Sequence, residues 1–138
     1  MRLSPLTGTT LCTVAVVVIA FVLFADVIPP RSNTYGAMHM MKRRILQYAA
    51  THDTLPESLN QLPTIEGYYN SITDGWGRPI LWHIEGEQVT LTSFGRDGRP
   101  GGFGEDADMV GVFRVKTSDG RWSEELCPWQ IDPFASVR

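Results

Sequence analysis

Cysteine is scarce in this chain of 138 residues, which contains only two. Cys12 lies within an apolar run, Cys127 lies near the C-terminus, and no C-x-x-C pair is present. Two cysteines so placed form neither a disulfide framework nor a thiolate metal centre. Cysteine usage therefore excludes a disulfide-rich scaffold and a metal centre of the C-x-x-C type.

Catalytic motifs are lacking as well. The three histidines do not stand in H-E-x-x-H or another metal-ligand spacing, and no G-x-S-x-G turn, P-loop or dinucleotide fingerprint occurs. Asp106 and Asp108 could pair as acid and base. A glycine-rich loop, however, has no apolar pocket that would give the two carboxyl groups different roles. We therefore predict no catalytic residues, no cofactor-binding motif and a protein that is not an enzyme.

An excess of positive charge is also absent. The formal net charge is −3, and basic residues do not alternate with aromatic ones. These features exclude nucleic acid as a partner. The one basic cluster, Lys42, Arg43 and Arg44, is interpreted as the solvated face of a helix.

There is a single long apolar run, at the N-terminus. Residues 4–25 carry no charge, and when the run is extended to Ile28 it includes one charge, Asp26. A helix over residues 9–28 would be long enough to cross a bilayer, so we predict a transmembrane helix there. The alternative is a cleaved secretory signal that ends at Ala25, although Leu23 occupies a position that such signals keep small.

The rest of the chain predicts a small α+β domain. Because Pro29 and Pro30 interrupt the helical pattern, residues 29–37 are predicted to form a linker or kink. Residues 38–51 carry apolar side chains at helical spacing, so we expect an amphipathic helix that packs on a small antiparallel sheet.

The sheet is predicted from runs of β-forming residues. Strands are expected over residues 78–84, 88–94 and 109–116, and a fourth could begin at Arg121. The α+β domain would then cover residues 38–116. Residues 117–138 would be a C-terminal extension, irregular after position 126.

The stretch from residue 91 to 109 is the richest in motif-like features. It contains five glycines and three aspartates, Asp97, Asp106 and Asp108. Aspartates in such a loop either cap local turns or converge on a hard cation that needs several oxygen ligands. The EF-hand pattern fails here, because the acidic residues do not alternate around a central glycine. Both interpretations, a solvated turn and a cation site, remain open on these residues alone.

Residues 74–109 resemble the C-terminal half of the major pseudopilin of type II secretion systems. That family carries a D-P-W-G-x-P-Y-x-Y strand followed by S-L-G-A-D-G-x-x-G-G-x-G-x-x-A-D-I. The matching residues here are Asp74, Trp76, Gly77, Pro79, Ser93, Gly95, Asp97, Gly98, Gly101, Gly102, Gly104, Ala107 and Asp108. The resemblance implies a pilin-like fold and a loop that binds calcium. We therefore predict side-chain ligands from Asp97, Asp106 and Asp108, and a carbonyl ligand from Phe94.

The N-terminus is similar to a prepilin leader. Residues 1–8 would be the leader, and the resemblance implies cleavage between Gly8 and Thr9 by a prepilin peptidase, together with methylation. Thr9 stands where the family has phenylalanine, and Thr13 stands where it has glutamate. These departures predict inefficient or absent cleavage.

The resemblance implies a structural subunit or accessory of a bacterial type II secretion or pilus-type assembly. Its partners would be the inner membrane and other pilin or pseudopilin subunits. It implies a single-pass protein of the inner membrane with an extracytoplasmic, periplasmic C-terminal domain, whereas the basic residues after the apolar run favour the opposite topology. The alternative function is a membrane-anchored extracytoplasmic binding module that does not polymerise.

Overall fold

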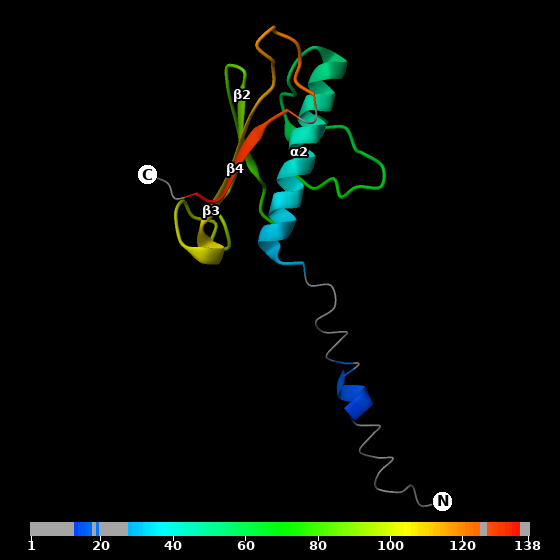
Figure 1. Ribbon diagram of the computed structural model, residues 1–138, viewed down its shortest axis with the longest axis vertical. Coiled ribbons are helices and arrows are strands. Elements are labelled where there is room, and N and C mark those ends of the chain that lie inside the picture. The colour runs from blue at the N-terminus through cyan, green and yellow to red at the C-terminus, as the bar shows by residue number, and fades with distance from the viewer. Residues whose placement is uncertain (1–12, 18, 20–27, 125–126, 136–138) are drawn as a thin grey trace, which may run out of the picture.

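The computed structural model describes residues 13–17, 19, 28–124 and 127–135. Its main body is one long helix, α2 (Pro30–His52), packed along a sheet of four antiparallel strands (Figure 1). The strands are β1 (Leu81–Glu85), β2 (Gln88–Ser93), β3 (Asp108–Arg114) and β4 (Trp129–Ala135), in the spatial order β1-β2-β3-β4. Two short 3₁₀ turns, η1 (Leu59–Gln61) and η2 (Gly104–Asp106), lie in the connections. The predicted α+β class, with a helix on an antiparallel sheet, is confirmed.

The predicted membrane anchor is not confirmed. Within the ranges given above, no helix is both long and apolar enough to cross a membrane, which contradicts the prediction of a single-pass inner-membrane protein. The helix α2 has 23 residues, but polar and basic side chains occupy much of it. The predicted leader, the Gly8–Thr9 junction and most of residues 9–28 lie outside the described residues.

Helix α2 begins earlier than the sequence predicted. Residues 29–37 were predicted to be a linker or kink, but the helix starts at Pro30, and Pro29 occupies the position before it in an extended conformation. Proline suits the first helical turn, because its fixed φ matches the helix and its missing N–H would have no partner there. The helix ends where Asp53 adopts a left-handed conformation, with φ of 55°.

The core lies between α2 and the sheet. Met38, Met41 and Ile45 on the helix are fully buried against Leu91 of β2 and Phe113 of β3. Inward-facing residues alternate along β2, as expected for a strand with one covered face. Burial of these side chains, worth about 1.5–3 kcal/mol each, is the main favourable term for the fold.

The basic cluster on α2 is not a solvated face. The exposed fraction is 5% for Lys42 and 4% for Arg44. Lys42 donates to the carbonyl of Cys127 at 2.5 Å. Arg44 holds three carbonyls of the following loop, those of Leu62, Pro63 and Asn70, at 2.7–3.3 Å. The two cations therefore tie α2 to segments on either side of it.

The C-terminal extension is not irregular after position 126. Strand β4 pairs with β3 along most of its length, from Phe113↔Trp129 to Asp108↔Ala135, with a bulge near Val110. Trp129 lies over Gly111, where an added Cβ would come within 2.6 Å of the indole Cζ3. The missing side chain at Gly111 thus makes room for an aromatic ring that covers β3, a pairing that sequence periodicity does not reveal.

Candidate functional site

A buried aspartate organises the turn that precedes β1. Oδ1 of Asp74 accepts hydrogen bonds from the backbone N–H groups of Trp76, at 3.0 Å, and Arg78, at 2.9 Å. Oδ2 accepts from the Ser93 hydroxyl at 2.8 Å and lies 3.7 Å from Nε of Arg78. Asp74 therefore connects this turn to the end of β2. Sequence reasoning noted Asp74 and Ser93 as matching letters but assigned them no role.

Arg78 extends this connection into the β2–β3 loop (residues 94–107). Its guanidinium donates to the carbonyl of Arg96 at 2.9 Å and also to the carbonyl of Gly95. Gly95 has a φ of +59°, and an added Cβ would lie 2.6 Å from the carbonyl oxygen of Asp106. Only glycine fits at this position, because the conformation is left-handed and the space is already filled by backbone.

A second arginine holds the other side of the same loop. Nη1 of Arg31, in the first turn of α2, donates to the carbonyls of Gly104 and Ala107 at 2.9 Å each. The guanidinium also lies over the ring of Phe134 in β4, 4.5 Å from its centroid. Figure 1 shows the loop beside the N-terminal end of α2, where this contact is made. The Arg31 side chain therefore connects α2, the β2–β3 loop and β4.

The structure does not gather the three predicted aspartates into one cluster. Asp97 is exposed, and its Oδ1 accepts from the backbone N–H of Arg99 at 3.0 Å. Asp106 forms an ion pair with Arg96, whose Nε lies 2.8 Å from Oδ1. This pair raises the pKa of Arg96 above its ordinary value. Within the described part of the chain, no group of three or more His, Cys, Asp or Glu residues is placed to hold a metal ion.

Asp108 differs from the other two. It is fully buried at the start of β3, and its Oδ2 accepts from the backbone N–H of Gly101 at 3.0 Å. Its Oδ1 is buried and has no hydrogen-bond partner among the described residues. A buried carboxylate oxygen without a partner is costly, and it is the kind of oxygen that a hard cation would coordinate. The backbone at Gly102 also lies close to the backbone of Asp106, since an added Cβ at position 102 would lie 2.6 Å from the Asp106 carbonyl oxygen. Asp108 therefore fits a calcium ligand better than Asp97 or Asp106.

Sequence reasoning missed a groove lined by aromatic and basic side chains. Its walls come from α2, from Tyr68 and from residues 127–129, and its volume is about 600 Å³. The His39 ring lies between Tyr35 and Trp129, with centroid distances of 4.5 and 4.4 Å. Partial burial, and then the charge of Lys42, lower the pKa of His39.

The lowered pKa of His39 predicts a loss of stability in acid. Because the folded-state pKa lies below the ordinary value of about 6.5, the unfolded chain binds the proton more readily. The free energy of unfolding should therefore fall as pH drops below about 6.5. Urea unfolding between pH 7.5 and 5 would measure this. The slope should flatten for His39→Phe and persist for His83→Gln, since His83 is exposed on β1. An unchanged slope in His39→Phe would contradict the assignment.

Comparison with known proteins identifies a family for this chain. A family model described as "Type II secretion system (T2SS), protein G" matches residues 32–112, more than half of the chain. The match runs from the first turn of α2 through the Asp74 turn and the β2–β3 loop into β3. Searches of curated proteins and of solved structures found no match. The chain belongs to the protein G family of the type II secretion system, the family of the major pseudopilin.

Proposed function

We propose that this chain acts as a structural subunit of a type II secretion assembly and that calcium stabilises its β2–β3 loop. The family assignment supports a pseudopilin-type subunit that associates with other such subunits, and it is consistent with a protein that is not an enzyme. It favours the subunit over the non-polymerising binding module. Cleavage between Gly8 and Thr9 by a prepilin peptidase stays a proposal, since both residues lie outside the described part.

The observation that carries the calcium proposal is the partnerless Oδ1 of Asp108. Calcium takes six to eight oxygen ligands at about 2.3–2.6 Å, and flexible carbonyls can supply several of them. Asp108 would be the anchor. Asp97 and the Phe94 carbonyl would be further ligands. Asp106 would become a ligand when its carboxylate leaves the ion pair with Arg96 and binds calcium instead. When bound, the cation would neutralise the buried carboxylate and hold the loop against the start of β3.

Thermal unfolding of the full-length chain with calcium or with chelator tests this proposal. A ligand that binds only the folded state at ten times its Kd adds about 1.4 kcal/mol. For a domain of this size that corresponds to a rise in Tm of roughly 4–8 °C. We expect such a rise with about 5 mM calcium, within reach of sites with Kd on the order of 10⁻⁴–10⁻³ M, and a smaller rise with magnesium.

Two variants locate the site. Asp108→Asn should abolish the calcium-dependent rise while unfolding in chelator no earlier than the wild type, because a neutral amide costs less to bury than a partnerless carboxylate. Asp97→Ala should reduce the rise. The matched control is Glu87→Gln, which removes an exposed carboxylate outside the loop and should leave the rise intact. The proposal fails if the wild type shows no rise, or if Asp108→Asn keeps the full rise.

A further inference from the structure

We propose that calcium bound in the β2–β3 loop stabilises the outer end of β4 on the sheet, and that Arg31 and Phe134 transmit this effect. The outer end is residues 132–135, the last four of the strand. The inference rests on the proposed calcium binding. It adds a consequence for a strand that lies beyond residue 112, where the family match ends.

The outer end of β4 makes little contact with the core. Asp132, Pro133 and Phe134 are exposed, whereas Trp129 and Ile131, nearer the start of the strand, pack against the core. Segments with few buried apolar contacts open locally at a small cost in free energy. The outer end is therefore the part of β4 that is most easily released from the sheet.

The pairing of β4 with β3 is irregular at the same end. The register shifts between the Val110↔Asp132 pair and the Asp108↔Ala135 pair. The proline between these pairs has no N–H to donate, and the N–H of Phe134 donates to Oδ1 of Asp132 at 2.9 Å. Backbone pairing alone therefore restrains the outer end less than the rest of the strand.

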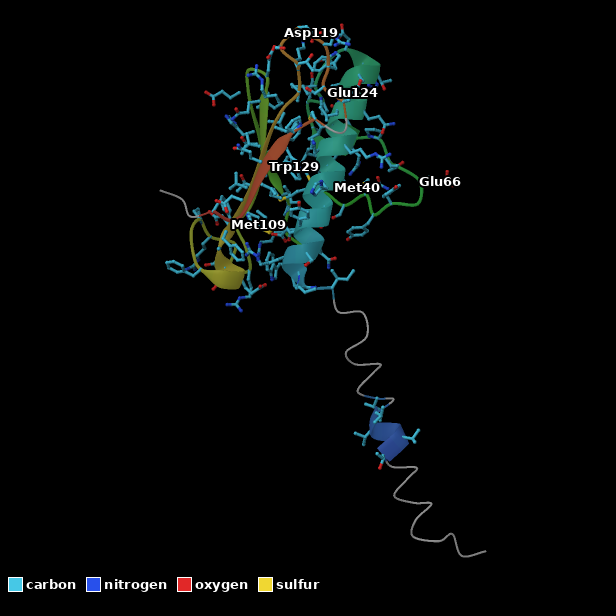
Figure 2. All side chains as sticks on the ribbon, in the orientation of Figure 1. Met40, Glu66, Met109, Asp119, Glu124 and Trp129 are labelled. Atoms are coloured by element: carbon cyan, nitrogen blue, oxygen red, sulfur yellow. The ribbon has the colours of Figure 1, made fainter. Side chains whose placement is uncertain are left out.

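The first link between the loop and the outer end is the β3–β4 pairing itself. Asp108, the proposed calcium anchor, is the first residue of β3 and pairs with Ala135 of β4. In Figure 2, Met109, next to Asp108, lies beside the loop, and Trp129 marks the opposite end of β4. An ion bound to Oδ1 of Asp108 would restrict the backbone at the position where the outer end is paired.

The second link is Arg31, in the first turn of α2. Its Nη1 donates to the carbonyls of Gly104 and Ala107 in the loop, and its guanidinium carbon lies 4.5 Å from the ring centroid of Phe134. The cation attracts the face of the ring, so the position of the guanidinium restrains the position of Phe134. A loop fixed by calcium would hold its carbonyls in place, and these carbonyls would keep Arg31 over the ring.

Two buried polar atoms give the effect its direction. Nη2 of Arg31 and Oδ1 of Asp108 are both buried and have no hydrogen-bond partner among the described residues. Opening of the loop would expose both atoms to water and remove the cost of burying them unpaired. Calcium would remove the cost at Asp108 while the loop stays closed. Bound calcium therefore shifts the equilibrium toward the closed loop and the paired outer end of β4.

Hydrogen exchange of the full-length chain measures the effect of calcium on β4. Mass spectrometry follows peptides that cover β4, once with saturating calcium and once with chelator. We expect calcium to slow exchange at the outer end by about three- to fivefold, the size of a cation–π contact at a partly exposed site. Strand β1, at the opposite edge of the sheet, is the internal reference and should change less.

The affinity for calcium measures the same coupling from the other side, because coupling between two sites is reciprocal. In isothermal titration calorimetry, Phe134→Ala should raise the Kd for calcium by the same three- to fivefold, although residue 134 is no proposed ligand and the change is uncharged. Phe134→Trp keeps a ring for Arg31 and should keep the affinity. The matched control is Tyr68→Ala, which removes an exposed ring 5.1 Å from the guanidinium carbon of Arg43 and should leave the Kd unchanged.

A double-mutant cycle tests the role of Arg31. If the ring acts through the guanidinium, Phe134→Ala should raise the Kd no further in a chain that already carries Arg31→Gln. A full additional rise would overturn the assignment of Arg31 as the residue that transmits the effect.

The outcomes separate this inference from the calcium proposal. Unchanged exchange at the outer end of β4, or an unchanged Kd in Phe134→Ala, overturns the coupling and leaves the calcium site standing. A Kd raised equally in Tyr68→Ala also overturns the coupling, because loss of any exposed ring would then weaken binding. Absence of calcium binding by the wild type overturns both proposals.

Discussion

Replacement of Gly75 by alanine should destabilise the domain by about 3 kcal/mol, the upper part of the range for overpacking a filled site. An added Cβ at position 75 would lie 2.0 Å from the carbonyl oxygen of Pro30 and 2.5 Å from its carbonyl carbon. Both are backbone atoms of the first residue of α2 and cannot rotate away. The backbone N–H of Gly75 also donates to the Thr34 hydroxyl at 2.9 Å, so any shift would cost this bond.

A second glycine provides the control. Gly36 lies on the exposed side of α2, and an added Cβ there would meet nothing within 4 Å. Gly36→Ala should therefore be neutral or raise stability by up to about 1 kcal/mol, the gain in helix propensity. Urea unfolding of Gly75→Ala and Gly36→Ala measures how much the same substitution changes the free energy of unfolding at each of the two positions. Equal stabilities would contradict the close packing of the Asp74 turn on the start of α2.

Replacement of Arg44 by methionine should lower the free energy of unfolding by about 3–5 kcal/mol, because a buried or partly buried carbonyl that loses its donor costs about 1–3 kcal/mol. The guanidinium donates to Pro63 at 2.7 Å, Asn70 at 3.0 Å and Leu62 at 3.3 Å. Burial lowers the pKa of Arg44 without removing its charge at neutral pH. Methionine keeps much of the side-chain volume, so the change mainly removes the hydrogen bonds.

The conservative variant separates charge from geometry. Arg44→Lys keeps a cation but cannot reach three carbonyls that the planar guanidinium holds together, so it should recover less than half of the loss. The control is Gln47→Met, which places the same side chain at an exposed position of α2 and should change stability by no more than about 0.5 kcal/mol. Wild-type stability in Arg44→Met would show that water replaces the guanidinium without cost.

Periodicity and turn chemistry were sufficient to predict much of the fold. The apolar spacing of residues 38–51 indicated the helix, and the β-branched runs indicated the first three strands, because both follow from burial of one face of an element. Pro30 was misinterpreted as a break, since local propensity does not show whether a proline interrupts a helix or begins one.

The cationic side chains show where prediction from sequence stops. Lys42 and Arg44 have the composition of a solvated face, but their partners are carbonyls of residues 62, 63, 70 and 127, distant in sequence. The three aspartates have the spacing of a cation loop, but Arg96 is paired with Asp106 and only Asp108 is left with a buried oxygen without a partner. Such partners are chosen by tertiary packing, which a local pattern does not encode.

Strand β4 is synthesised last, so the contacts that it makes with α2 and β3 form late. The region that the family model matches ends at residue 112, but Trp129 covers β3, and Lys42 of α2 hydrogen-bonds across 85 positions of sequence to the Cys127 carbonyl. Contacts so far apart along the chain have to wait for the intervening residues. While the ribosome still holds the C-terminal segment, Tyr35 and His39 on the flank of α2 lack their contacts with Trp129. During synthesis this flank of α2 is therefore accessible to chaperones and to other unfinished chains. This period ends when β4 pairs with β3.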